Sequence, residues 1–184
     1  MLKNSVYRLT LSAMFLALAL ALPFLTGQLP QLGMALLPMH LPVLLCGFVC
    51  GWPYGLVVGL VAPLLRTFLF GMPPLMPTAL AMAFELAAYG AFAGLLYAMT
   101  PPKSVYLYLS LVIAMLLGRL VWGIVSLALY ALFLGNAFTA GMFVSGAFVT
   151  AWPGIVAQLV LVPPIVMALE HAKLIPAAKM SAAK

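Results

Sequence analysis

Long apolar segments alternate with short stretches of proline, glycine and charge along the whole chain. A helix needs about 20 apolar residues to cross the hydrocarbon core of a bilayer. The pattern therefore predicts an all-α membrane protein, a bundle of six transmembrane helices with both termini cytoplasmic, within one membrane domain that covers residues 1–184. The expected helices cover about 5–25, 37–51, 54–70, 78–99, 105–134 and 148–173.

Two of these segments allow more than one interpretation. The second is short, and the Trp52-Pro53 pair after it predicts a tight turn, because proline disfavours helical geometry in the residue before it. The second and third segments are therefore also compatible with a single re-entrant pair. The fifth segment is longer than a span requires, so its helix is expected to be tilted, kinked at a glycine or protruding.

The composition excludes whole classes of protein. The chain of 184 residues is 67% hydrophobic and 5% charged, whereas soluble domains are about one quarter charged. Its surface is suited to a lipid bilayer and not to water, which excludes soluble enzymes and DNA-binding proteins. The net charge of +6 is not clustered on any stretch, so no nucleic-acid partner is expected.

The distribution of lysine and arginine predicts the orientation. With six spans and an inner N-terminus, the expected outer loops at 26–36, 71–77 and 135–147 hold no lysine or arginine. Basic residues accumulate on the cytoplasmic side of membrane proteins. All basic residues except Arg66 and Arg119 then lie on the inner side, namely Lys3, Arg8, Lys103, Lys173, Lys179 and Lys184.

Three charges, Arg66, Glu85 and Arg119, fall deep inside the expected spans, away from their inner ends. At ~1.5 Å per residue, Arg66 lies about 7 Å and Glu85 about 12 Å below the same outer loop. A charge at the centre of a bilayer costs roughly 2.5–3.5 kcal/mol, so such residues normally face the bundle interior and are paired. We expect Glu85 mainly to position Arg66, which leaves Arg119 as a spare cation that can bind a carboxylate. The alternatives are that Arg66 and Glu85 only neutralise each other and that Arg119 extends to an interface.

Further polar and aromatic side chains lie toward the expected outer face or near the middle of the spans. Each one alone is also compatible with ordinary packing or with a position at a helix end. Together they predict an apolar cavity with a few polar groups that opens to the outside, as small-molecule sites usually do. The candidate substrate-binding residues are Arg66, Glu85, Arg119, His40, Tyr89, Trp122, Asn136 and Gln158.

Motifs of enzymes and metal sites are not found in the sequence. It contains no HExxH, no phosphate loop, no paired carboxylates and no set of serine, histidine and aspartate, so an enzyme is not expected. Cys46 and Cys50 have no neighbouring histidine or cysteine cluster, and we expect them to be packing thiols. No metal or cofactor is expected.

Small residues form a stripe on the first expected helix. Ala13, Ala17 and Ala21 are spaced by four residues and share one face. Such stripes let a second helix approach closely in lipid, where packing drives association. The second helix can belong to a partner protein or to the same chain, and the spacing alone leaves both possibilities open.

The segments "MHLPVLLCGF" and "GMPPLMPTALAMAFE", together with the six short spans and the alanine stripe, identify a resemblance. The chain resembles the substrate-binding S components of energy-coupling factor (ECF) transporters of prokaryotic cell membranes. The resemblance implies that the chain binds a vitamin near the outer face. It also implies partners, one transmembrane coupling protein that docks on the alanine stripe and two ATPase subunits.

Within that family, the chain looks most like members assigned to pantothenate. Pantothenate is a carboxylate, in agreement with a spare guanidinium, but folate, biotin, nicotinate and lipoate are carboxylates too. A different class of protein, a stand-alone secondary carrier for a small organic anion, would need an intramembrane acid for proton coupling, and Glu85 is the candidate. A non-transporting membrane scaffold would leave Arg119 without a role.

Overall fold

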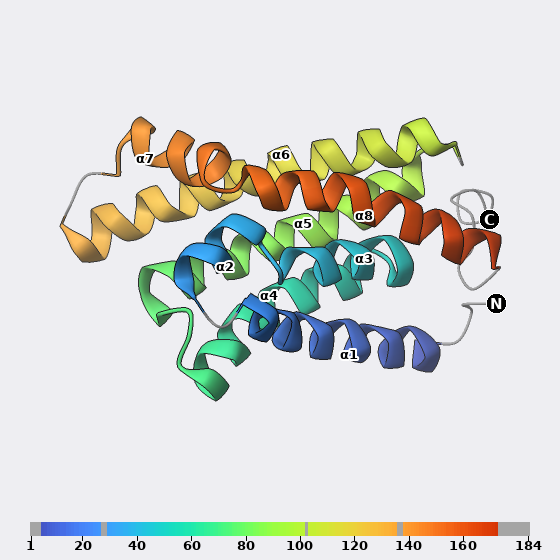
Figure 1. Cartoon of the computed structure of the whole chain (residues 1–184), viewed down its shortest axis with the longest axis horizontal. Coiled ribbons are helices and arrows are strands. Elements are labelled where there is room, and N and C mark those ends of the chain that lie inside the picture. Colours follow the sequence, from blue (N-terminus) through green and yellow to red (C-terminus); the bar gives the residue numbers. More distant parts are fainter. Residues whose placement is uncertain (1–4, 27–28, 102, 136–137, 173–184) are drawn as a thin grey trace.

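A computed structural model describes residues 5–26, 29–101, 103–135 and 138–172, which are almost entirely helical and contain no strand. Its helices run side by side along the length of the molecule (Figure 1). In chain order they are α1 (Ser5–Ala21), η1 (Leu22–Thr26), α2 (Pro30–Leu36), α3 (His40–Cys50), α4 (Trp52–Phe70), η2 (Leu75–Ala79), α5 (Leu80–Met99), α6 (Ser104–Leu129), η3 (Tyr130–Leu134), α7 (Ala140–Val144), η4 (Ser145–Val149) and α8 (Trp152–His171).

Six helical segments of the described chain are long and apolar enough to cross a membrane. This confirms the predicted six-helix bundle, and the protein is a multi-pass membrane protein. The beginning of α1 and the end of α8 lie at one end of the bundle, and α2, α7 and the segment before α5 lie toward the other (Figure 1). The six segments are Ser5–Leu25, Gln31–Cys50, Trp52–Phe70, Leu75–Met99, Ser104–Phe133 and Trp152–His171.

The turn between α3 and α4 differs from the prediction. Trp52 and Pro53 do not form the turn but begin α4, with proline in the first helical turn. Proline is well tolerated there because the amide hydrogen that it lacks would have no partner within the helix. The chain reverses instead at Gly51, whose φ of 97° is readily adopted only by glycine.

Two segments expected as outer loops contain short helices. α2 occupies most of the expected loop 26–36, with Pro30 in its first turn, and it ends at Leu37, whose φ is 51°. α7 lies in the expected loop 135–147, and α8 begins at Trp152, later than expected. Helices of five to seven residues are too short to produce a clear apolar period, so the sequence pattern did not reveal them.

α3 is the most buried helix, because every residue in it except Leu41 is buried. It packs against α1, α4, α5 and α8. Glycines allow its contact with α4 and α5, since a Cβ on Gly47 would lie 2.4 Å from the carbonyl oxygen of Gly90 on α5, and one on Gly55 of α4 would lie 2.8 Å from the Cα of Gly47. Small residues at crossings let helices approach closely in membranes. This close packing brings α3 and α5, which carry His40 and Glu85, side by side.

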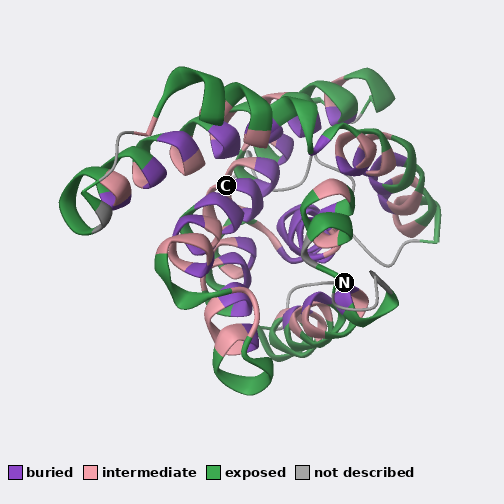
Figure 2. Cartoon of the chain, turned by 60° about the vertical axis from the view of Figure 1, so that its left-hand side comes forward, coloured by how far each residue is buried: buried purple, intermediate pink, exposed green. Residues whose placement is uncertain are grey.

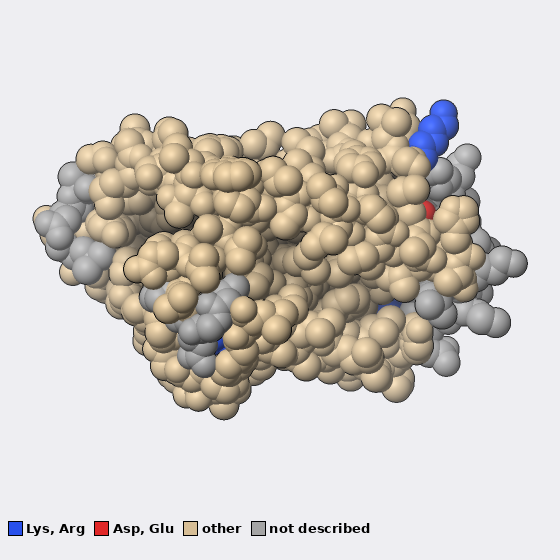
Figure 3. Space-filling model, in the orientation of Figure 1, with Lys and Arg blue, Asp and Glu red and all other residues tan. Residues whose placement is uncertain are grey.

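The outer surface of the bundle is apolar. Buried residues gather between the helices, and exposed residues lie on their outward faces (Figure 2). Large apolar side chains such as Val6, Phe68 and Ile124 are more than 60% exposed, as expected where lipid surrounds a helix. Few charged atoms appear on the face in Figure 3, and most of them lie toward the end where α1 begins. The cytoplasmic orientation of the termini stays a prediction.

Candidate functional site

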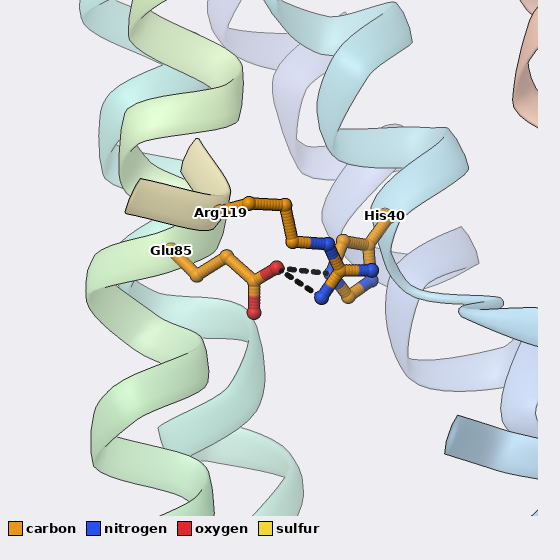
Figure 4. A network of polar contacts seen from close by, with 3 residues as sticks. All are labelled: His40, Glu85 and Arg119. Atoms are coloured by element: carbon orange, nitrogen blue, oxygen red, sulfur yellow. Dashed lines mark ion pairs between the residues drawn. The ribbon is translucent and has the colours of Figure 1, made fainter. Parts of the chain in front are cut away.

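Three helices bring a histidine, a glutamate and an arginine together inside the bundle (Figure 4). Glu85 on α5 is 1% exposed, and its Oε1 lies 2.7 Å from Nη1 of Arg119 on α6. The same oxygen lies 3.4 Å from Nε2 of His40, the first residue of α3. His40 and Arg119 are also buried, at 1% and 4% exposure. The cluster is a buried ion pair with an imidazole beside it.

The predicted pair of Arg66 and Glu85 is wrong, because Glu85 pairs with Arg119. Arg66 points instead toward the end of α1, where its Nη1 donates a hydrogen bond of 2.7 Å to the carbonyl oxygen of Leu20. The last carbonyls of a helix lack partners within the helix and attract cations. The guanidinium also lies 5.0 Å from the ring centre of Phe24 and 5.4 Å from that of Phe70. Arg66 is thus held by a carbonyl and two aromatic rings.

Many polar atoms of the cluster have no hydrogen-bond partner in the described part of the chain. Arg119 makes no such bond through Nε or Nη2, and neither ring nitrogen of His40 makes one. The hydroxyl of Tyr89 and both amide atoms of Gln158 are in the same state. In a membrane, each buried polar group without a partner costs several kcal/mol. So many of them in one bundle indicate a place where a polar ligand supplies the missing partners.

A cavity of about 320 Å³ and a smaller one of about 120 Å³ lie within the described bundle, and the smaller one adjoins Arg119. Its other walls come from Tyr89 and from apolar side chains of α6, η4 and α8. Small-molecule sites usually measure 300–1,000 Å³, so in this form the cavity has room for only part of a vitamin. The apolar lining residues are Val112, Met115, Leu116, Phe148, Ile155 and Leu159.

Tyr89 connects the cluster to this cavity. The ring of Tyr89 lies edge-on to that of His40, with 5.2 Å between the ring centres. It also packs against Gly118, where a Cβ would lie 3.1 Å from the ring. Gln158 is buried on α8, the helix that also contributes Ile155 and Leu159 to the cavity. Four of the eight predicted site residues, His40, Glu85, Tyr89 and Arg119, are therefore buried together at one place.

Trp122 was expected to bind substrate, but it does not line the cavity beside Arg119 and packs instead against phenylalanines. Its ring stacks on Phe143 at 6.1 Å and meets Phe138 edge-on at 5.8 Å. Phe148, which contacts Phe143, lines the cavity, so this aromatic cluster covers the cavity at one end. Sequence reasoning missed these phenylalanines, although two of them, Phe138 and Phe143, lie within the expected outer loop 135–147 and were an available signal. Asn136, also predicted, lies outside the described residues.

The alanine stripe lies on the surface. Ala13, Ala17 and Ala21 are all exposed, whereas Ser12 and Ala19 on the opposite side of α1 are buried. α1 packs on α3 and α4 through that opposite side. The stripe therefore does not serve contacts between helices of the described chain.

The larger cavity lies at the end of the bundle where α8 ends. It is lined by α5, α6 and α8, and next to it the hydroxyl of Tyr97 donates a hydrogen bond to Oε1 of Glu170. Glu170 thus has a partner, unlike the polar atoms around Arg119. Although it is larger, this cavity contains few unpaired buried polar groups and is the weaker candidate. Its lining residues are Tyr97, Lys103, Ser104, Leu107, Met167, Glu170 and His171.

Comparison with known proteins gives one match. No curated protein and no solved structure matches the chain. The family model described as "ECF transporter, substrate-specific component" matches residues 7–166, which is most of the chain and includes every residue of the buried cluster. A substrate-specific component must recognise a small molecule, and a buried polar cluster beside a cavity is compatible with that role. The chain belongs to the family of substrate-specific components of ECF transporters.

Proposed function

We propose that this chain binds a small vitamin that carries a carboxylate, such as pantothenate, and delivers it through a separate ECF coupling and ATPase module. The observation that carries the proposal is the free edge of Arg119. Nη1 pairs with Glu85, while Nε and Nη2 have no partner among the described residues. These two nitrogens form one side of the planar guanidinium, and such a side binds a carboxylate with two parallel hydrogen bonds.

The surroundings of Arg119 suit the rest of such a ligand. Tyr89, which lines the same cavity, offers a hydroxyl that can bind the hydroxyl or amide groups of a molecule like pantothenate. The buried amide of Gln158 on α8, which has no partner among the described residues, is a further candidate. The apolar walls of the cavity suit its hydrocarbon parts. Because the cavity measures only about 120 Å³, binding of the whole vitamin requires the bundle to open, and the aromatic cluster around Phe143 is the cover that would move.

The predicted orientation places this site toward the outer face. Glu85 lies five residues after the start of α5, and His40 is the first residue of α3. Both positions are far from Lys103, which precedes α6 and is expected on the cytoplasmic side. A site at this depth takes its substrate from outside the cell, as an importer requires.

The exposed alanine stripe supports the partner assignment. Ala13, Ala17 and Ala21 leave a smooth surface on α1 that a helix of the transmembrane coupling protein can approach closely. No nucleotide-binding motif occurs in the sequence, so the two ATPase subunits must be other chains.

The second candidate function is a stand-alone secondary carrier for a small organic anion. Glu85, a buried intramembrane acid, is the observation that favours it. Uptake that continues in cells without the ECF ATPases would support the carrier, and uptake that stops would support the ECF mechanism.

The substrate is tested directly by mass spectrometry of small molecules that co-purify with the chain from its host membrane. We expect to find one vitamin that carries a carboxylate. The amount of this vitamin bound per protein molecule should be lower in the Arg119→Met variant. A protein that retains an uncharged molecule instead would contradict the carboxylate assignment.

A further inference from the structure

The cluster of His40, Glu85 and Arg119 is electrically neutral as long as His40 is neutral. Glu85 contributes one negative charge and Arg119 one positive charge, and their closest atoms are 2.7 Å apart. The other two nitrogens of the Arg119 guanidinium, Nε and Nη2, have no hydrogen-bond partner among the described residues, and under the proposed function they bind the ligand. A carboxylate bound there would share Arg119 with Glu85, and the cluster would then hold two negative charges against one positive charge.

No other charged side chain among the described residues faces the cluster to balance that excess. On α5, Tyr89 is uncharged, and on α4, Arg66 is bound to the carbonyl of Leu20 at the end of α1. Arg8 on α1 lies near Gly51, at the opposite end of α3 from His40. On α8, the ionisable residues Glu170 and His171 lie at the far end beside the other cavity. An uncompensated charge buried in a membrane protein is strongly unfavourable, so the compensation must come from the cluster itself.

Both Glu85 and His40 can take up a proton, and the geometry favours His40 because Glu85 then keeps its charge and its pairing with Arg119. Its Nε2 lies 3.4 Å from Oε1 of Glu85, and neither ring nitrogen has a hydrogen-bond partner in the described structure. A protonated imidazole donates hydrogen bonds from both nitrogens. Protonated His40 would therefore donate a charge-assisted hydrogen bond to Glu85, which compensates for the weaker pairing of Glu85 with Arg119 when the ligand also binds Arg119. The distance of 3.4 Å between Nε2 of His40 and Oε1 of Glu85 needs to shorten only slightly to reach the usual length of such a hydrogen bond.

We propose that the site binds a carboxylate ligand together with one proton, which His40 takes up from solvent. The inference rests on the proposed function, because it assumes that the ligand carboxylate binds Arg119. The charges balance, since the ligand and Glu85 contribute two negative charges and Arg119 and protonated His40 contribute two positive charges. The arrangement selects ligands with a single carboxylate, because the described cluster has no third cation for a second one.

The test is isothermal titration calorimetry of the purified full-length chain with D-pantothenate and with its uncharged alcohol, D-pantothenol. Titrations at the same pH in phosphate and in Tris, two buffers that differ in ionisation enthalpy, give the number of protons taken up per bound ligand. At a pH where His40 is neutral in the free protein, we expect about one proton per pantothenate and none per pantothenol. Pantothenate affinity should then fall by about tenfold per pH unit in that range, whereas pantothenol affinity should not change.

Variants assign the proton to the cluster. In His40→Gln, proton uptake and the pH dependence of pantothenate affinity should disappear. In Glu85→Gln, the ligand carboxylate replaces the lost charge, so pantothenate should bind without proton uptake. His171→Gln is the matched control, because His171 is the second histidine of the chain and lies beside the other cavity, and it should behave like the unchanged protein.

Three results would overturn the inference. If the unchanged protein binds pantothenate without taking up a proton, the proton inference is wrong, but the proposed function is not affected. This result does not depend on whether any variant folds. Undiminished proton uptake in His40→Gln would place the proton on another group. Failure of both pantothenate and pantothenol to bind would remove the pantothenate assignment, and the proton inference would fall with it.

Discussion

Arg66 and Arg119 are both buried in the membrane part of the bundle, at 3% and 4% exposure, but their surroundings differ. Arg66 is surrounded by groups of its own chain, namely the carbonyl of Leu20 and the rings of Phe24 and Phe70. Arg119 has an acidic partner and still leaves two nitrogens without a hydrogen bond in the described structure. An intramembrane charge is therefore a sign of a binding site when it lines a cavity among other buried polar atoms that lack partners, as Arg119 does.

The two regions also lie at different kinds of junction. Arg66 connects the end of α1 to α4 and stabilises that contact. Arg119 lies where α3, α5 and α6 meet beside a cavity. We therefore assign a structural role to Arg66 and a ligand-binding role to Arg119, and the following predictions test that division in order of decreasing effect.

The largest effect is expected on stability when Glu85 is removed. Glu85→Ala leaves the guanidinium of Arg119 buried without an acid, which should lower the free energy of unfolding by about 3–5 kcal/mol, the cost known for broken buried pairs in soluble proteins. The double variant Glu85→Leu with Arg119→Met should recover most of that stability, as measured by denaturant unfolding in detergent. If the double variant is as unstable as Glu85→Ala, the ion pair is not what Glu85 contributes.

The next effect concerns ligand binding. Arg119→Met removes the edge that binds the ligand carboxylate, so the binding free energy of pantothenate should weaken by about 1.5–3 kcal/mol, the value of a hydrogen bond to a charged group. Calorimetry measures the affinity, and the unfolding curve of the same sample shows that the variant is folded. A folded variant with unchanged affinity would exclude Arg119 from the site.

Removal of Arg66 is expected to affect stability and not binding. Arg66→Met loses the hydrogen bond to Leu20 and two contacts with aromatic rings, which should lower the free energy of unfolding by about 2 kcal/mol. Pantothenate affinity of the folded variant should stay as in the unchanged chain. A loss of affinity as large as that of Arg119→Met would remove the distinction between the two arginines.

The smallest effect on either property is expected at the alanine stripe. Ala17→Trp changes an exposed residue outside both arginine regions, so stability and affinity should change by no more than about 0.5 kcal/mol. Vitamin uptake by cells should nevertheless stop, because the larger side chain blocks the approach of the coupling protein. Leu18→Trp, also exposed on α1 but turned about 100° around the helix from Ala17, is the matched control and should leave uptake intact. Equal uptake by the two variants would contradict the docking surface.

The sequence predicted the six-span fold because the bilayer imposes one strong constraint, a minimum length of apolar helix. It did not predict α2 or α7, which are too short to show that length. It predicted a turn at Trp52-Pro53 because proline restricts the conformation of the residue before it. Proline is also well tolerated in the first turn of a helix, and this is where Pro53 lies in α4.

The sequence also identified most members of the cluster, because a polar residue within an apolar span is conspicuous. It paired the wrong residues for a geometric reason. Counting residues from a loop gives the depth of a side chain but not the direction in which the helix turns it. Arg66 and Glu85 were expected at similar depth, but Arg66 faces α1 and Glu85 faces α6. Such directions depend on how the helices pack, which the pattern along one chain does not specify.

The most direct test of the division between the arginines is a thermodynamic cycle with two ligands and three proteins. D-pantothenate and D-pantothenol are titrated into the unchanged chain, Arg119→Met and Arg66→Met at one pH. We predict that the unchanged chain and Arg66→Met prefer the acid by about 1.5–3 kcal/mol and that this preference almost disappears in Arg119→Met. Equal binding of acid and alcohol by the unchanged chain, or loss of the preference in Arg66→Met alone, would contradict the assignment of Arg119 as the carboxylate-binding residue.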